Sequence, residues 1–290
     1  ETVYGVACVA LSRAAVEAVC TAKGRPSDNH LIVRGASWSD LRSVVGPLDA
    51  LLEAKAQAIA DRFWPGPLTL VLPKAEGVPP IVTAGRSTIA VRIPGHAVAR
   101  RLIESAGVLV AAPSANRFMG LSPTRVEDLD PRIAEAAAVV IDAGPCPVGI
   151  ESTVLDLTVN PPQLLRPGMI GVKALGEALG GGIEVPDAVA TGPKAAPGQY
   201  HRHYAPNTPV MLVDMLGSRP GLTFGSAGAG QLHMPSDPAE YAAKLYASLA
   251  ELDRAEHPAI FIERPPDGDA WRAVWDRLRK ASSDAGRISP

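Results

Sequence analysis

Two regions of alternating apolar runs and amphipathic segments, separated by a stretch rich in glycine and proline, dominate this sequence of 290 residues. Short apolar runs are typical of buried strands, and the segments between them have the spacing of amphipathic helices. From about residue 167 to 206 glycine and proline are frequent, and apolar periodicity is lost after one short helical stretch at 172–179. The sequence therefore predicts an α/β domain over 1–166, an ordered linker over 167–206 and a small second α/β domain over 207–290.

The apolar runs place most of the expected elements. In the first domain we expect strands at 31–33, 68–72, 89–91, 108–110 and 139–141, and helices at 48–63 and 96–106. In the second domain we expect strands at 210–213 and 260–262, and helices that begin at Asp237 and Asp269. Because strands and helices alternate there, a parallel sheet is favoured.

Composition limits the class of protein. Hydrophobic residues make up 47% of the chain, enough for a substantial core, and no apolar run has the length of a membrane-spanning helix. The formal net charge is −2, acidic and basic residues are equally numerous over 1–166, and aromatic residues make up only 4%. These values argue against a dedicated nucleic-acid-binding domain. They are compatible with a local basic cavity, because net charge does not report how charges are distributed.

Three scattered cysteines, Cys8, Cys20 and Cys146, form no C-x-x-C pair and no metal-ligand spacing. This pattern is typical of reduced, buried thiols, so we expect a cytoplasmic protein. We find no secretory signal in the first residues. Because the chain starts inside what looks like a strand-to-turn segment, we also expect further residues to precede Glu1.

Several common catalytic and binding motifs are absent from the sequence. It contains no G-x-x-x-x-G-K-[ST] phosphate loop, no H-E-x-x-H zinc motif and no G-x-S-x-G nucleophile motif. The glycine-rich stretch at 225–230 does not match G-x-G-x-x-G in register and is better explained as a turn. His201 and His203 lack further ligands nearby. We therefore expect no metal held by protein side chains.

Two short polar pairs are candidates for an anion site. Lys23 and Arg25 lie two residues apart, so in an extended segment both side chains would leave the same face. A lysine point charge beside a bidentate arginine suits a polyphosphate. Ser114 and Asn116 have the same spacing and follow a buried apolar run, and strand ends are where α/β sheets bind ligands. Alone, each pair is explained at least as well by structure, as a basic turn before Pro26 and as a helix cap or Asx turn.

Two further segments carry rigid or polar residues beside predicted strands. The stretch 63–70 sets a Pro-Gly-Pro turn before a buried strand, and its role is expected to be architectural. The stretches 149–154 and 164–168 place hydroxyl groups and Arg166 near two apparent strand ends. None of these clusters is decisive by itself, but their order along the chain is informative.

Taken together, the motifs resemble those of the threonylcarbamoyl-AMP synthase family. The matching segments are Glu1-Thr2-Val3-Tyr4-Gly5, Lys23-Gly24-Arg25-Pro26, Trp64-Pro65-Gly66-Pro67-Leu68-Thr69, Ala90-Val91-Arg92-Ile93-Pro94, Pro113-Ser114-Ala115-Asn116 and Glu151-Ser152-Thr153. Pro197-Gly198 and His203-Tyr204-Ala205-Pro206, followed by a further domain, resemble the long two-domain form of the family. The resemblance covers almost the whole chain.

The resemblance implies a nucleotidyltransferase that makes threonylcarbamoyl-AMP and pyrophosphate from L-threonine, bicarbonate or CO2, and ATP. The product would serve threonylcarbamoyladenosine modification beside the anticodon of tRNA, through downstream tRNA threonylcarbamoyl transferase proteins. Mg²⁺ would be bound through the ATP phosphates. The implied architecture is a twisted mixed-sheet N-terminal α/β domain with an open cavity, an ordered linker that closes over this cavity, and a small Rossmann-like C-terminal domain.

The resemblance also assigns residues to roles. Lys23, Arg25, Ser114 and Asn116 would form the catalytic set, which acts by positioning and charge neutralisation rather than as a nucleophile. The implied ATP-binding residues are Lys23, Arg25, Asn29, Thr88, Ser114, Asn116, Ser122, Arg166, and either Tyr200 or His201. The implied threonine-binding residues are Thr2, Arg34, Arg92, Ala112 and Ser152, with Arg92 the expected partner of the threonine carboxylate.

Two departures from the family pattern and two alternative functions complete the prediction. The family usually has proline where His30 stands and histidine where Arg34 stands, so we expect an altered threonine side of the pocket.

A carbamoyl-AMP-forming enzyme of the hydrogenase-maturation type is one alternative function, which the long linker and second domain disfavour. A non-catalytic RNA-binding module is the other. The balanced charge of the first domain disfavours strong RNA affinity, and weak RNA binding stays open.

Overall fold

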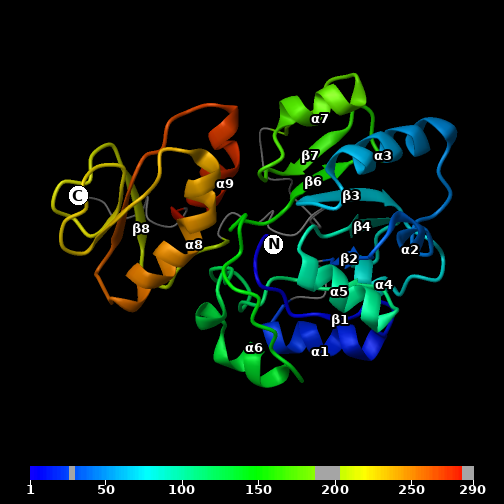
Figure 1. Ribbon diagram of the computed structural model, residues 1–290, viewed down its shortest axis with the longest axis horizontal. Coiled ribbons are helices and arrows are strands. Elements are labelled where there is room, and N and C mark those ends of the chain that lie inside the picture. The colour runs from blue at the N-terminus through cyan, green and yellow to red at the C-terminus, as the bar shows by residue number, and fades with distance from the viewer. Residues whose placement is uncertain (26–29, 187–202, 283–290) are drawn as a thin grey trace.

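The computed structural model describes residues 1–25, 30–186 and 203–282 (Figure 1). Within this part of the chain, buried apolar residues form two large clusters, one in each of two α/β units. The C-terminal unit packs beside the larger N-terminal unit (Figure 1). Among the described residues, no helix combines the length and the apolar character needed to cross a membrane.

A seven-stranded mixed sheet forms the centre of the N-terminal unit. Its strands are β1 (Cys8–Val9), β2 (Ile32–Arg34), β3 (Leu68–Pro73), β4 (Thr88–Arg92), β5 (Val110–Ala111), β6 (Thr153–Asp156) and β7 (Gln163–Arg166). They lie in the order β1-β5-β2-β4-β3-β6-β7. Strands β2 and β4 pair in parallel, as do β3 and β6, and the other neighbours are antiparallel. The predicted mixed α/β fold is confirmed.

The register of this sheet gathers polar residues at one end. Arg34 ends β2 and lies opposite Arg92, which ends the parallel strand β4. Strand β3 runs the other way, so its first residue, Leu68, lies at the same end and pairs with Thr153 at the start of β6. Strand β7 also ends there, with Arg166. Three arginines from three strands are thus brought together with the residues that precede β6.

Helices pack around the sheet, and local signals fix their ends. They are α1 (Arg13–Lys23), α2 (Trp38–Arg42), α3 (Ala50–Phe63), α4 (Pro80–Thr83), α5 (Ala97–Ala106) and α6 (Pro131–Ala136), with a 3₁₀ turn at Val126–Asp128. Asp49 caps α3 by accepting a hydrogen bond from the Leu52 N–H at 2.8 Å. The helices predicted at 48–63 and 96–106 are confirmed as α3 and α5, with starts shifted slightly inward.

Residues 170–185, in the predicted linker, pack against the N-terminal unit. Helix α7 (Val172–Leu179) has the predicted bounds, lies near α3 in Figure 1, and buries Leu175 in the first core. The chain then returns to the sheet edge, where the Leu164 N–H donates to the Glu184 carbonyl at 2.8 Å. The later linker residues 187–202 lie outside the described residues.

The C-terminal unit is built on a parallel sheet, as predicted, with four strands where the sequence indicated two. Its strands are β8 (Val210–Val213), β9 (Gly221–Thr223), β10 (Gln231–His233) and β11 (Ile260–Glu263), in the order β10-β9-β11-β8. Helix α8 (Pro238–Arg254) begins at Asp237, whose carboxylate accepts from two backbone N–H groups at 2.9 Å. A 3₁₀ turn at Asp269–Trp271 leads into α9 (Arg272–Ser282).

Two predicted strands differ from the structure. The strand expected at 108–110 is short and begins only at Val110. The prediction of a strand at 139–141 is wrong: these described residues have no strand conformation, and Val139 is 73% exposed. Apolar, β-branched sequence is not enough for a strand, because the backbone groups must also find a partner strand. Here 139–141 instead border an apolar groove beside α1, α5 and α6.

Candidate active site

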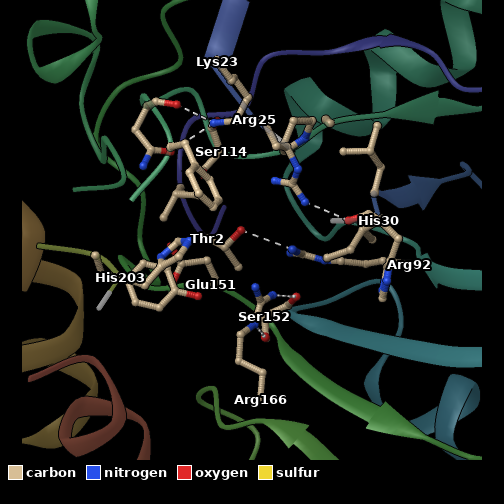
Figure 2. Close-up of a pocket in the computed structure, with 18 of the residues that line it drawn as sticks. Thr2, Lys23, Arg25, His30, Arg92, Ser114, Glu151, Ser152, Arg166 and His203 are labelled. Carbon is tan, nitrogen blue, oxygen red and sulfur yellow. Dashed lines mark hydrogen bonds between the residues drawn. The ribbon is translucent and has the colours of Figure 1, made fainter. Parts of the chain in front are cut away.

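A pocket opens where the sheet gathers its arginines (Figure 2). Its lining comes from the start of the chain, the end of α1, strands β2, β4 and β7, the segment after β5, the residues before β6, and the segment His203–Tyr204. Among the described residues, its charged lining consists of Lys23, Arg25, Arg34, Arg92 and Arg166 against the single carboxylate of Glu151. The pocket is therefore suited to a ligand with several negative charges.

Lys23 joins helix α1 to the segment after β5. It is the last residue of α1 and is only 3% exposed. Its ammonium donates to the backbone oxygens of Ser114 and Asn116, and to Oδ1 of Asn116 at 3.3 Å. These oxygens favour the charged form, but burial, helped by Arg25, dominates and lowers the pKa of Lys23 to about 7. An anion bound beside Lys23 would restore its full charge.

The prediction that Lys23 and Arg25 share one face of an extended segment is wrong. Helix α1 continues through Lys23, and Gly24 ends it with a φ of 59°, a left-handed conformation that glycine adopts without steric cost. Both cations still line the pocket, one from the helix end and one from the residue after the cap. The helix cap considered at Ser114 is also absent from the described chain, where Ser114 bridges to Gly5 instead.

Arg92 is a buried arginine whose donor groups are already engaged. Its Nε donates to the Gly66 carbonyl at 2.9 Å, and its two terminal nitrogens donate to Thr2 Oγ1 at 3.2 Å and to Glu1 Oε2 at 2.5 Å. Gly66 belongs to the Pro-Gly-Pro turn, so this turn helps to hold Arg92 in place. Because Glu1 pairs with it, Arg92 is less available to a ligand carboxylate than the sequence suggests.

Arg34 lies beside Arg92 with fewer partners. It donates to the Ile32 carbonyl at 3.0 Å, the one acceptor found for it in the described part of the chain. Burial, followed by the charges of Arg92 and Arg166, lowers the pKa of Arg34 to about 9. Nearby, burial lowers the pKa of His30 to about 3, so its imidazole is neutral. Arg34 is therefore the cation on this side of the pocket with the most capacity for an incoming anion.

Ser152 and Arg166 form a polar pair on the side of the pocket opposite Lys23 (Figure 2). The Nε of Arg166 donates to the Ser152 carbonyl at 3.0 Å, and a terminal nitrogen donates to Ser152 Oγ at 3.0 Å. Ser152 Oγ also lies 2.8 Å from Thr69 Oγ1 on β3. Side chains from β3 and β7 thus fix the hydroxyl group of Ser152, directly before β6, at the pocket wall.

The pocket brings together most of the predicted site residues, namely Thr2, Lys23, Arg25, Arg34, Arg92, Ala112, Ser114, Asn116, Ser152 and Arg166. Two predicted ATP contacts lie elsewhere. Thr88 begins β4, at the other end of this strand from Arg92, and Ser122 is fully buried and donates to Glu151 at 2.6 Å. Asn29, Tyr200 and His201 lie outside the described residues.

The lining residues that received no role from the sequence include Glu151, His203 and Tyr204. Glu151 directly precedes Ser152 in a segment that the sequence singled out, so its position was a usable signal. Its partner Arg277 lies 126 residues further along the chain, and no local pattern connects the two.

Comparisons with known proteins agree with this architecture. A family model described as telomere recombination matches residues 1–168, and one described as threonylcarbamoyl-AMP synthase, C-terminal domain, matches residues 170–283. Threonylcarbamoyl-AMP synthases of Pyrococcus abyssi and Bacillus subtilis are each 37% identical to this chain. These alignments cover 97% and 99% of this chain, respectively, and 88% of each relative.

Solved structures show the same arrangement. The crystal structure of P. abyssi Sua5 complexed with L-threonine matches with a TM-score of 0.88 and 38% identity, over 97% of this chain and 88% of that chain. A double variant of that protein matches with a TM-score of 0.86. Fold and pocket thus define a two-unit α/β enzyme with a cationic site. The chain belongs to the threonylcarbamoyl-AMP synthase family, as its motifs predicted.

Proposed function

We propose that this enzyme joins L-threonine, bicarbonate or CO2, and ATP to give threonylcarbamoyl-AMP and pyrophosphate. The observation that carries the proposal is the charge of the pocket, where five lysine and arginine side chains face one carboxylate. That carboxylate is already bonded to Ser122, Tyr246 and Arg277, so a triphosphate would balance an excess of positive charge. Membership of the family, and a relative that binds L-threonine, support the second substrate.

On the phosphate side, Lys23 and Arg25 would bind the ATP phosphates, with Arg166 reaching them from the opposite wall. Ser114 and Asn116 would contribute hydrogen bonds from a segment that Lys23 itself holds in place. Asn29, Thr88, Ser122, Tyr200 and His201 stay predicted ATP contacts.

On the threonine side, Arg34 would take the substrate carboxylate, because Arg92 is already paired with Glu1. Arg92 would instead hold the hydroxyl of Thr2 in position. Ser152 would bond a polar group of threonine, and Ala112 would contact its apolar part. This assignment changes the role that the resemblance gave to Arg92 and keeps the set Thr2, Arg34, Arg92, Ala112 and Ser152 together.

The chemistry needs no covalent bond to the protein. The threonine amine attacks the carbon of CO2 and loses a proton to give a carbamate. A carbamate oxygen then attacks the α-phosphorus of ATP, and the bond from that phosphorus to pyrophosphate breaks. The pocket would act by aligning the two reactants and by neutralising charge on the phosphates through Lys23, Arg25 and Arg166.

Mg²⁺ would enter as part of the substrate, bound to the ATP phosphates. Among the described residues, no group of three or more histidine, cysteine, aspartate or glutamate side chains is placed to hold a metal ion. The pocket carboxylate, Glu151, already accepts hydrogen bonds from three side chains. The donor set therefore suits a metal that arrives with its own phosphate ligands.

Three wider proposals follow from the same assignment. The adenylate would pass to tRNA threonylcarbamoyl transferase proteins for tRNA modification, in the cytoplasm. The enzyme itself would bind RNA weakly at most. We also propose a Rossmann-like fold for the C-terminal unit, which its four parallel strands support.

The decisive experiment is incubation of the protein with MgATP, bicarbonate and labelled L-threonine. We expect pyrophosphate release that depends on threonine, and a labelled adenylate that mass spectrometry identifies as threonylcarbamoyl-AMP. Product with carbamoyl phosphate but none with threonine would instead indicate the hydrogenase-maturation type of enzyme. Absence of ATP turnover together with tight RNA binding would reject the enzymatic proposal.

A further inference from the structure

The residues that lead into β6 are embedded in the C-terminal unit. Ile150 is fully buried and belongs to the same apolar cluster as Tyr241, Leu245 and Leu249 of α8. Gly149 lies so close to α8 that a Cβ atom there would come within 2.4 Å of the Ala242 carbonyl oxygen. The chain passes from this contact directly into Glu151 and Ser152, which line the pocket. The pocket wall is therefore continuous with an interface between the two units.

Glu151 is the polar centre of this interface. Its Oε1 accepts from Ser122 at 2.6 Å, and its Oε2 accepts from Tyr246 of α8 at 3.0 Å and from the Nε of Arg277 of α9 at 2.9 Å. Arg277 is 1% exposed and also bonds Asp276 at 2.5 Å and the Pro167 carbonyl at 3.1 Å. Two of the three groups that hold the pocket carboxylate thus belong to the C-terminal unit.

The charges around Glu151 come from both units. Arg277 and Tyr246 face it from the C-terminal unit, Arg166 and Lys23 from the N-terminal unit, and Tyr204 and His203 from the segment between the units. Asp276 is bound to Arg277 and to Lys280. Burial by itself raises the pKa of Glu151, but Arg277, Arg166 and the Ser122 hydrogen bond outweigh it and hold the pKa at about 2.

We propose that Arg277 is a positioning residue that the C-terminal unit supplies to the substrate pocket, where it fixes and neutralises Glu151. The inference rests on the proposed function and extends it, because it assigns the second unit a part in ATP binding. Without Arg277, the carboxylate would stand less compensated in a pocket that must accept phosphates, and like charges there repel strongly at low dielectric constant. Glu151 would also lose one of its anchors, immediately beside Ser152.

Four variants of the full chain test this role: Arg277→Met, Arg277→Lys, Glu151→Gln and the double variant Glu151→Gln with Arg277→Met. Arg279→Met is the matched control, since Arg279 lies on the same helix but is exposed and stacks on Trp275. We expect Arg277→Met to raise the KM for ATP at least about tenfold while the KM for threonine changes less. Arg277→Lys should recover part of the loss.

The double variant separates charge from packing. The amide oxygen introduced by Glu151→Gln could still accept from Tyr246, and no uncompensated carboxylate would be present, so the double variant should bind ATP better than Arg277→Met alone. If Arg277→Met fails to fold, the double variant and Arg277→Lys are compared with wild type instead. Equal impairment of the double variant and Arg277→Met, or a normal KM for ATP in all variants, would overturn the proposal.

A second measurement does not depend on activity. Without Arg277, burial should raise the pKa of Glu151 above its unfolded value, so the thermal midpoint of Arg277→Met should fall further behind wild type as the pH rises from about 5 to about 8. The double variant should lack this dependence, because it has no carboxylate at residue 151. If wild type makes no threonylcarbamoyl-AMP but this pH dependence appears, the proposed function fails while the pairing of Arg277 with Glu151 stands. An active wild type without the pH dependence overturns the pairing alone.

Discussion

The pocket has two charged walls, and the fold treats them differently. On one wall Lys23 donates to carbonyl and amide oxygens, and burial lowers its pKa to about 7. On the other wall Glu151 accepts from Arg277, Tyr246 and Ser122, and its pKa is held at about 2. Both groups are buried, but only the second has an ion-pair partner among the described residues. Lys23 therefore becomes fully charged only when an anion binds, whereas Glu151 is already charged in the folded protein without a ligand.

Because of this difference, substitutions on the two walls should have different effects on ligand binding and on stability. Changes on the phosphate wall should reduce binding and turnover more than stability, because its cations face the pocket and Lys23 donates to neutral oxygens. Changes on the interface wall should reduce stability first, because they disturb a packed junction between two units. The following predictions test that separation, in order of decreasing size.

The largest effect is expected for Arg25→Ala. Arg25 lines the pocket directly after the cap of α1, and one of its terminal nitrogens donates to the nearby His30 carbonyl at 2.8 Å. Loss of one positioned donor for phosphate charge typically lowers turnover about 10²–10³-fold. We expect a loss of this size in kcat/KM for ATP with a thermal midpoint within a few degrees of wild type, measured by pyrophosphate release and calorimetry.

Arg13→Ala, at the start of α1, is the control, because Arg13 is exposed and pairs only with Glu17 within the described chain. It should behave as wild type. Lys23→Ala is a less clean test, since it also removes the donor to three oxygen atoms and should destabilise the protein. Normal turnover in Arg25→Ala would show that this wall does not bind phosphate.

The next effect is a loss of stability from Gly149→Ala. Gly149 has a φ of 75°, and its new Cβ would meet the backbone of α8 at 2.4 Å. Such overpacking typically costs about 1–3 kcal/mol. Gly107→Ala is the matched control, with a φ of 62° but no atom within 4 Å of the added Cβ, so it reports the cost of the backbone conformation alone. Equal unfolding free energies of the two variants in urea would contradict a tight junction.

Patterns that depend on neighbours in sequence were predictable. Apolar runs located β2, β3, β4, β8 and β11, and Asp237 marked the start of α8, because strand burial and helix capping are local properties. The motifs also located most of the pocket. Their grouping in space, however, follows from the strand order and from parallel pairing of β2 with β4, which no single segment encodes.

Three features of the site could not be predicted from the sequence, for physical reasons. Lys23 and Arg25 would share one face only if both lay in an extended segment. Helix α1 instead continues through Lys23 and ends at Gly24, which has a left-handed backbone conformation. The pairing of Glu151 with Arg277 joins two units across 126 residues, a separation that no local sequence pattern spans. Arg92 shows a third case, since its pairing with Glu1 is visible only in three dimensions.

A smaller effect, on binding alone, is expected for Arg34→Met. Replacing a buried arginine that has one described acceptor by an apolar side chain should leave the unfolding free energy unchanged or higher. The affinity for L-threonine should fall about tenfold, which corresponds to about 1.4 kcal/mol. Calorimetric titration with threonine checks this, and Arg34→Lys should retain part of the affinity. A destabilised variant that binds threonine normally would show that Arg34 supports the fold and does not bind the substrate.

The smallest predicted effect is a dependence of ATP affinity on pH through Lys23. Burial lowers the pKa of Lys23 to about 7, so the free enzyme loses this proton as the pH rises past neutrality, while bound phosphate favours the charged form. The dissociation constant for ATP should therefore increase about fivefold between pH 7 and 8, with proton uptake on binding that calorimetry in buffers of different ionisation enthalpy detects.

The lowered pKa of Lys23 also affects stability. The unfolded chain keeps the proton up to a higher pH, so this group should make the free protein more stable as the pH rises above about 7. In Lys23→Met both dependences should vanish, and Lys74→Met, on a lysine outside the pocket, should keep them. If the ATP affinity is constant between pH 7 and 8, Lys23 is fully charged before ATP binds. Lys23 and Glu151 would then not differ in whether their charge depends on a ligand.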